Sequence, residues 1–237
     1  MFYKEICKPH PSDYTRNGKI SFEAILQILE SVASNHSESV DDSIADANKN
    51  GIAWILTEWR VKILRRPESG ESLHITTWVR GKAPASAVYR YFLLTDKNGT
   101  ELILAEAKFA LFDLGTSRLT RISEELLSLY QPEAKTMFED AQRLRAPSEF
   151  TSEKELQLRR SDIDFNGHVH NTRYVDLATE VLPNDIFAKD DFMEFHVLYV
   201  KPVMESTVVK AKYVFKDSAH LVAVYADDVY CALVEFK

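Results

Sequence analysis

The chain has 237 residues, of which 45% are hydrophobic, and its formal net charge at pH 7 is -7. This much apolar sequence can fill one large core or two smaller ones, and two domains of one architecture fit best. The negative charge argues against a general nucleic-acid-binding protein, because such a protein normally needs a basic face to neutralise phosphates.

The first part of the chain predicts one helix followed by a meander of strands. A buried helix face is predicted by the apolar positions Phe22, Ile25, Leu26, Leu29, Val32 and Ala33. Residues 35–50 are polar and acidic and predict a loop with a short helix. Strands are predicted at 51–64, 72–80, 87–95 and 101–113, a turn at 96–99 and a short helix at 123–130. This order is the one expected when a sheet wraps around a central helix.

The second part of the chain repeats this plan. Residues 131–150 are charged, contain proline and are weakly periodic, so they predict a linker. A strand is predicted at 155–160 and a helix at about 170–182, with Asn171 as its N-cap and Pro183 after its end. Further strands are predicted at 191–201, 206–216, 219–226 and 229–236. Each half is therefore predicted to be α+β, with a mainly antiparallel sheet.

A short segment occurs twice, at a constant offset of 149 positions. Residues 12–20 align with residues 161–169, with Ser, Asp, Asn and Gly identical, and an apolar helical pattern follows each copy. Two copies of one structural unit are the simplest explanation. Asp, Asn and Gly are common in turns for conformational reasons alone, so the shared residues are interpreted as structural. By this reasoning Asp162, matched by Asp13, is a turn or cap residue.

The residues that differ between the copies are interpreted as functional. Asp164 and His168 of the second copy are replaced in the first by Thr15 and Lys19, so the groups that exchange protons near neutral pH are missing there. A loop that brings Asp, Asn and His to a helix N-terminus can polarise a carbonyl and handle a proton. Metal binding by Asp164, His168 and His170 is a second interpretation of the same residues.

The two cysteines and the N-terminal residues indicate the cellular compartment in which the protein is expected. Cys7 and Cys231 lie far apart and lack metal-site spacing, so free thiols in a reducing cytosol are expected. The first residues lack the apolar core of a signal peptide, and no run approaches the length of a membrane span. We therefore expect a cytoplasmic protein that binds neither membrane nor nucleic acid.

The segment Asp162-Ile163-Asp164-Phe165-Asn166-Gly167-His168-Val169-His170-Asn171, with the duplicated plan around it, resembles the acyl-acyl carrier protein thioesterases of fatty acid synthesis. The resemblance implies a tandem (double) hotdog, in which each α+β half is a mainly antiparallel sheet wrapped around a long helix. It makes residues 1–130 a non-catalytic hotdog that lines the acyl tunnel, residues 131–150 the linker and residues 151–237 the catalytic hotdog.

The same resemblance implies a reaction and a partner. The reaction is hydrolysis of the thioester that joins a fatty acyl chain to the phosphopantetheine arm of acyl carrier protein. No metal and no organic cofactor is implied, and a homodimer is compatible with the family. Rival hypotheses are an acyl-CoA thioesterase, a non-catalytic acyl-binding protein of the same fold and, less well supported, a hydratase.

The family pattern Asp-x-Asn-x-His falls on Asp164, Asn166 and His168. We expect His168 to transfer a proton with the attacking water, Asp164 to orient or charge that assembly, and Asn166 to hydrogen-bond water or substrate. Direct attack by Asp164 is the alternative. The backbone N–H groups near Gly167, His168 and Val169 are expected to hold the carbonyl oxygen.

One position departs from the family pattern. Members usually carry a Glu on the strand after the catalytic helix, in a segment like Tyr-x-x-Glu, and here Pro202 stands at that place after Tyr199. Proline cannot accept or deliver a proton. Three explanations stay open: Glu205 acts from a shifted position, the loop residues act alone, or catalysis is impaired.

Overall fold

The computed structural model describes residues 1–82, 85–138, 144–205 and 207–237. The chain folds as two compact units, Met1–Ala141 and Gln142–Lys237. The predicted linker, residues 131–150, includes residues 139–143, which lie outside the described residues. Before that gap the chain contacts the first unit, where the backbone N–H of Glu133 donates to the Val79 carbonyl at 2.9 Å.

The first unit is built on an antiparallel sheet with the strand order β1-β3-β4-β5-β2. Its strands are β1 (Tyr3–Cys7), β2 (Ile52–Ile63), β3 (Leu73–Arg80), β4 (Val88–Thr95) and β5 (Glu101–Asp113). The short strand β6 (Arg118–Thr120) pairs with β5. The predicted strands at 51–64, 72–80, 87–95 and 101–113 are confirmed, whereas β1 and β6 were not predicted.

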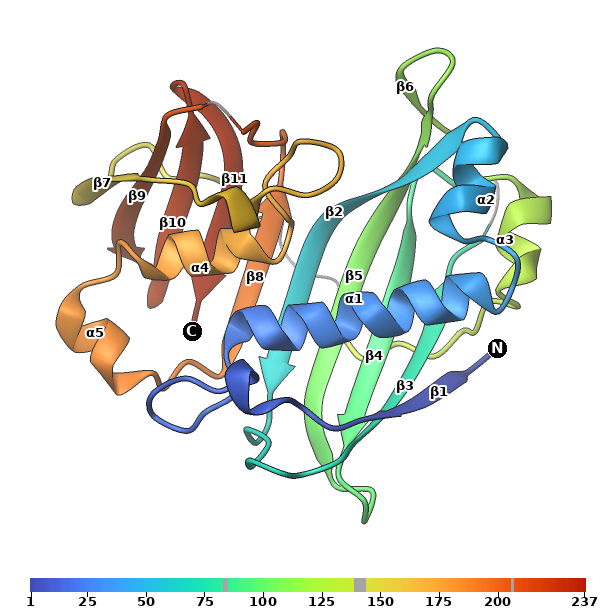
Figure 1. The fold of residues 1–237 in the computed structure, drawn as a ribbon, viewed down its shortest axis with the longest axis horizontal. Helices are drawn as coiled ribbons and strands as arrows, with labels where there is room; N and C mark the ends of the chain where they lie inside the picture. The colour runs from blue at the N-terminus through green and yellow to red at the C-terminus, as the bar shows by residue number, and fades with distance from the viewer. Residues whose placement is uncertain (83–84, 139–143, 206) are drawn as a thin grey trace. The chain divides into compact units, whose positions relative to one another are not determined.

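A long helix, α1 (Phe22–Glu38), lies across this sheet (Figure 1). Ser21 caps its N-terminus by accepting a hydrogen bond from the Ala24 N–H at 3.1 Å. Its buried residues include all six of the predicted apolar positions: Phe22, Ile25, Leu26, Leu29, Val32 and Ala33. The short helices α2 (Ile44–Lys49) and α3 (Glu124–Leu129) complete the unit, and both lie where a short helix was predicted.

The second unit has an antiparallel sheet with the order β8-β11-β10-β9-β7. Its strands are β7 (Ser152–Leu156), β8 (Glu194–Tyr199), β9 (Val209–Lys216), β10 (Ala219–Ala226) and β11 (Val229–Phe236). Helix α4 (Arg173–Thr179) packs against β10 and β11, and a further helix, α5 (Asn184–Lys189), follows it. Four of these strands lie where they were predicted.

Two predictions about the second unit were wrong in detail. The helix predicted at about 170–182 spans only Arg173–Thr179, and Thr172 rather than Asn171 is its N-cap. It ends where the Thr179 hydroxyl donates to the Asp176 carbonyl at 2.8 Å, a local bond that competes with helix continuation. The strand predicted at 155–160 ends at Leu156, because the chain then enters a 3-10 turn at Arg160–Asp162.

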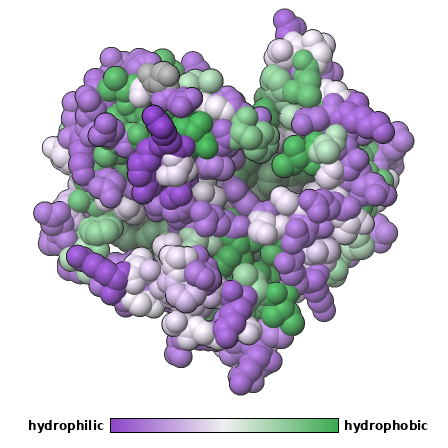
Figure 2. All heavy atoms as spheres, in the orientation of Figure 1, coloured by the Kyte–Doolittle hydropathy of each residue, from purple (hydrophilic) through white to green (hydrophobic). Residues whose placement is uncertain are grey.

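Apolar side chains fill the interior of both units. The face shown in Figure 2 is mostly hydrophilic, with smaller groups of hydrophobic residues between the polar ones. In the described residues, no helix is both long enough and apolar enough to cross a membrane.

Candidate functional site

The candidate loop joins β7 to α4 and is closed by its own backbone. It opens with the 3-10 turn Arg160–Asp162, and an isolated antiparallel bridge then pairs Ile163 with Val169. Gly167 has φ +77°, in the left-handed region that favours glycine. The residues of the Asp-x-Asn-x-His pattern therefore lie on one tight turn.

Asp164 organises this turn with its side chain. Its Oδ1 atom accepts hydrogen bonds from the backbone N–H groups of Asn166 at 2.8 Å and His168 at 3.0 Å. Partial burial raises the pKa of Asp164, but the N–H donors of His168 and Asn166 outweigh it and leave the pKa below its ordinary value. The carboxylate is therefore ionised at neutral pH.

The side chains of Asn166 and His168 lie close to this carboxylate. The Asn166 amide Nδ2 is 3.5 Å from Asp164 Oδ2, at the outer limit of a hydrogen bond. The nearby His168 also helps to lower the pKa of Asp164. Asn166 is exposed and His168 is half-buried, so both can reach a molecule that arrives from solvent. The structure thus brings the three predicted residues together.

The backbone donors expected around a carbonyl oxygen are engaged within the protein. The N–H of Gly167 donates to the Asp164 carbonyl at 3.0 Å, and the N–H of Val169 donates to the Val203 carbonyl at 2.9 Å. The N–H of His168 donates to Asp164, as described above. Each of these three N–H groups would have to share or give up its present hydrogen bond in order to donate to an oxyanion, and their role stays a prediction. The Asn166 side-chain amide is the better-placed donor.

A second segment runs beside the loop. His168 forms an isolated antiparallel bridge with Met204, and the hydroxyl of the buried Tyr174 accepts a hydrogen bond from the Val203 N–H at 2.9 Å. Pro202 precedes Val203 and Glu205 follows Met204, and both Pro202 and Glu205 are exposed. Glu205 therefore follows directly on the backbone partner of His168, a placement that sequence spacing did not reveal.

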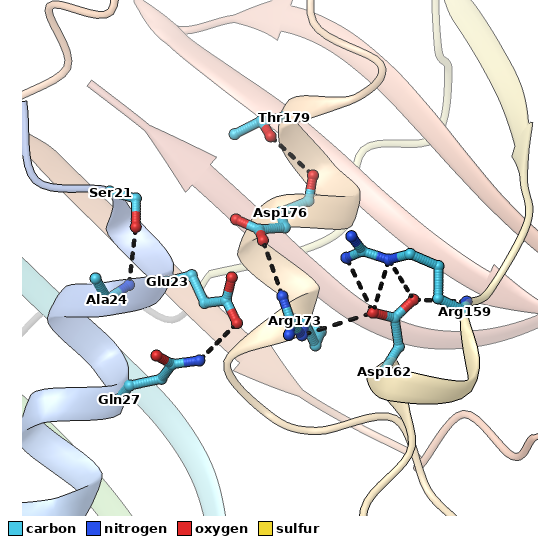
Figure 3. A network of polar contacts seen from close by, with 9 residues as sticks. All are labelled: Ser21, Glu23, Ala24, Gln27, Arg159, Asp162, Arg173, Asp176 and Thr179. Atoms are coloured by element: carbon cyan, nitrogen blue, oxygen red, sulfur yellow. Dashed lines mark hydrogen bonds and ion pairs between the residues drawn. The ribbon is translucent and has the colours of Figure 1, made fainter. Parts of the chain in front are cut away.

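Asp162 lies at the base of the loop in a charged network (Figure 3). It is 3% exposed, and its Oδ2 atom accepts the Arg159 backbone N–H at 2.7 Å. Its Oδ1 atom lies 3.0 Å from Arg159 Nη2 and 3.6 Å from Arg173 Nε. Asp162 also accepts the His170 N–H on its carbonyl at 2.9 Å, so it joins the two ends of the loop. These contacts support the structural interpretation of Asp162. The contact between Arg173 and Asp162 was not predicted from the sequence.

The first unit contains a loop with the same backbone pattern. The Thr15 N–H donates to the Lys19 carbonyl at 2.8 Å, as Asp164 donates to His168 at 2.7 Å. The Gly18 N–H donates to the Thr15 carbonyl at 2.9 Å, and Gly18 has φ +71°. An isolated bridge between Tyr14 and Ile20 closes this loop, as Ile163 and Val169 close the other. The two sequence copies thus adopt one local structure.

Metal binding gains no support from the described part of the chain. No group of three or more His, Cys, Asp or Glu side chains in it is arranged to hold a metal ion. His170, the third ligand of that hypothesis, is exposed.

The chain matches known family models over most of its length. A model of the acyl-ACP thioesterase N-terminal domain matches residues 3–130, and a model of the C-terminal domain matches residues 145–228. Both units therefore fall under the same family description.

Curated relatives and solved structures agree with this match. An acyl-[acyl-carrier-protein] hydrolase of Cuphea viscosissima is 24% identical over 81% of this chain and 49% of its own length. The chain spans about half the length of the first such relatives. The 12:0-ACP thioesterase from Umbellularia californica is 20% identical with a TM-score of 0.88, covering 100% of this chain and 96% of that one. An acyl-ACP thioesterase from Bacteroides thetaiotaomicron is 19% identical with a TM-score of 0.89, covering 99% and 96%. The α+β tandem hotdog is confirmed.

Proposed function

Because the chain belongs to the acyl-ACP thioesterase family, we propose that it hydrolyses the thioester of fatty acyl-acyl carrier protein to free fatty acid and the carrier-protein thiol. The observation that carries the proposal is the difference between the two loops. They share a backbone pattern, but the positions that hold Thr15, Asn17 and Lys19 in the first loop hold Asp164, Asn166 and His168, a carboxylate, an amide and an imidazole, in the second. These are the groups that water-mediated acyl transfer needs.

In the proposed mechanism, His168 accepts a proton from the water that attacks the thioester carbonyl. Asp164, ionised and fixed by two backbone N–H groups, stabilises the imidazolium that forms. His168 then delivers a proton to the departing thiolate. Direct attack by Asp164 is the less favoured route, because its oxygen Oδ1 is already occupied by two hydrogen bonds and its lowered pKa marks a weak nucleophile.

We assign Asn166 to the developing oxyanion. Its amide is exposed and its hydrogen bond to Asp164 Oδ2 is long, at 3.5 Å, so it can turn toward a substrate at small cost. The N–H groups of Gly167 and Val169 remain second candidates, which would act only if substrate binding displaced their present acceptors.

Glu205 is the proposed substitute for the acid that Pro202 replaces. Its support is positional: it follows Met204, the backbone partner of His168, and it is exposed. We expect Glu205→Gln to lower the hydrolysis rate about tenfold if the carboxyl takes part in proton transfer. An unchanged rate would favour catalysis by the loop residues alone.

The deciding experiment is a thiol-release assay on the purified chain with acyl carrier proteins that bear chains of different length and saturation. Time-dependent release of carrier thiol supports the proposal. Equal or faster turnover of matched acyl-CoA esters would point to an acyl-CoA thioesterase instead. Acyl binding without release from either carrier would favour the non-catalytic alternative, which Pro202 makes worth testing.

Acyl carrier protein is the proposed partner, and a homodimer and a cytoplasmic location remain proposals. Cys7 and Cys231 are free thiols, which fits a reducing compartment. Sedimentation of the chain with and without acyl carrier protein tests both associations, and fractionation of the source cells tests the location.

A further inference from the structure

An exposed phenylalanine lies inside the candidate catalytic loop and takes no part in the proposed proton transfer. Phe165 stands between Asp164 and Asn166, and 79% of it is exposed to solvent. Consecutive Cα atoms are about 3.8 Å apart, so its ring leaves the backbone one residue away from both polar groups. Phenylalanine is a residue that folded proteins usually bury. Its placement at the tip of this loop therefore calls for a reason.

The turn itself does not require an aromatic residue at this place. The matching position of the first loop is Arg16, which follows Thr15 as Phe165 follows Asp164. Arg16 is also exposed, and the two loops share their backbone hydrogen bonds and a glycine with positive φ. The same turn thus forms with a charged side chain at its tip. The aromatic ring belongs to the differences between the loops, as Asp164 and His168 do.

A second exposed apolar side chain lies next to His168. Met204 is 45% exposed and forms the isolated antiparallel bridge with His168. Residues directly opposite each other in an antiparallel pair project their side chains from the same side, with Cβ atoms about 5 Å apart. The thioether of Met204 therefore lies beside the imidazole. Single exposed apolar residues are common on protein surfaces, but here two of them adjoin one group of polar side chains.

One part of the proposed substrate suits such an exposed apolar surface. The thioester carbonyl has to reach Asn166 and His168, with the acyl chain on one side of it and the pantetheine arm on the other. The arm leads to the carrier, a folded protein that stays outside, so the arm runs along the solvent-exposed side of the site. The methylene groups next to its sulfur are apolar and the following amide is planar, and both can pack on an aromatic ring. A long acyl chain gains more from surface that is fully removed from water.

We propose that the Phe165 ring packs against the part of the pantetheine arm next to the sulfur, the two methylene groups and the first amide, and so holds the thioester at Asn166 and His168. The inference rests on the proposed function, since it takes the ligand to be an acyl thioester of a pantetheine arm. It adds a substrate-binding residue at a position that the Asp-x-Asn-x-His pattern leaves open. Packing of this kind removes apolar surface from water and limits the rotation of the bound thioester.

The test is calorimetry on the full chain with stable substrate analogues, in which a methylene group between carbonyl and sulfur prevents hydrolysis. One analogue carries an octanoyl group and pantetheine, and a second carries an ethyl group in place of pantetheine. We expect Phe165→Ala to weaken binding of the pantetheine analogue about tenfold and binding of the ethyl analogue less than twofold. Retained binding of the ethyl analogue also shows that the variant is folded. The tenfold loss should be unchanged when the octanoyl group is replaced by palmitoyl.

Two matched variants serve as controls. Arg16→Ala changes the corresponding exposed position of the first loop, and Phe187→Ala removes a phenylalanine of α5 that is 46% exposed. Both should bind both analogues within about twofold of wild type. They separate a contact made by the Phe165 ring from a general effect of removing an exposed side chain.

The proposal is overturned if Phe165→Ala binds the pantetheine analogue as wild type does, or if it weakens both analogues equally. A loss that grows with acyl length also overturns it, because the ring would then contact the acyl chain. So does a wild-type chain that binds no pantetheine analogue, or an equal loss in either control. None of these outcomes depends on hydrolysis. Failure of the thiol-release assay would therefore reject the proposed reaction while the binding ratio still decides the role of Phe165.

Discussion

The loop of residues 10–21 and the loop of residues 159–170 have the same backbone and different side chains. In each, an Asp side chain accepts a backbone N–H three residues earlier at 2.7 Å, and its carbonyl accepts an N–H eight residues later at 2.8 or 2.9 Å. A glycine with positive φ occupies the same place in both turns. The turn therefore forms without Asp164 or His168, which are absent from the first loop.

The comparison shows what the second loop adds beyond folding. In the first loop the Thr15 hydroxyl accepts the Asn17 N–H at 3.3 Å, which is sufficient to shape the turn. In the second, the Asp164 carboxylate accepts the corresponding N–H at 2.8 Å and a further one from His168 at 3.0 Å. The added charge and the adjacent imidazole are the features that the proposed hydrolysis would use.

The largest effect is expected from removing the imidazole. His168→Ala should lower the rate of thiol release by about a thousandfold, because water then attacks without a general base. Lys19→Ala, at the matching position of the first loop, should leave the rate within about twofold. Circular dichroism on both variants checks that they are folded. Equal losses in the two variants would contradict the division of labour.

The next effect concerns stability and contrasts the two capping aspartates. Asp162 is 3% exposed and lies within 3.0 Å of Arg159 and 3.6 Å of Arg173, whereas Asp13 is half-buried and caps one short turn. We expect Asp162→Ala to cost about 2 kcal/mol, because it removes the buried acceptor of the Arg159 backbone N–H and the ion-pair contacts with the Arg159 and Arg173 side chains. Asp13→Ala should cost about 1 kcal/mol, as for a lost cap. Urea unfolding of both variants measures the difference, and similar costs would show that the charge network adds nothing.

A smaller kinetic effect is expected from neutralising Asp164. Asp164→Asn keeps an oxygen that can accept the two backbone N–H groups but removes the charge beside His168, so we expect about a hundredfold slower release. The wild-type pKa of Asp164 lies below its ordinary value, so this group stays ionised as pH falls until the acid range is reached. The loss should therefore be the same from about pH 5 to pH 8.

A loss that vanished at the lower end of this range would contradict that assignment, since it would mean that Asp164 titrates there. Thr15→Asn at the matching position serves as the control. It introduces the same amide into the first loop and should change neither rate nor stability appreciably.

Regular elements were predicted well because their pattern is local. The apolar stripe of α1 specifies one face of that helix, and the structure buries this face. The Asn98-Gly99 pair predicted the turn before β5, where Gly99 has φ +86°. The copied segment predicted the second loop for the same reason, because its turn depends on nearby backbone bonds.

What the sequence could not supply depends on contacts between distant residues. Strand β1 is five residues long, and it is defined by its pairing with β3 rather than by its own pattern. His168 and Met204 are 36 positions apart in the sequence and are joined by an isolated bridge. Sequence spacing alone therefore could not predict that Glu205 follows the backbone partner of His168.

The smallest effect is the sharpest test of the loop comparison. An added Cβ would meet nothing within 4 Å at either Gly18 or Gly167, so alanine at each position costs only the strain of positive φ. We expect Gly18→Ala and Gly167→Ala to lose about 1 kcal/mol of stability each. Only Gly167→Ala should also slow thiol release, by about tenfold, because the strained turn displaces Asn166 and His168 from the substrate. Unfolding and thiol-release measurements on both variants separate the two effects. Equal losses of stability with slower release only in Gly167→Ala support two loops of one structure, of which one is active. Slower release in Gly18→Ala as well would mean that the first loop also takes part in the reaction.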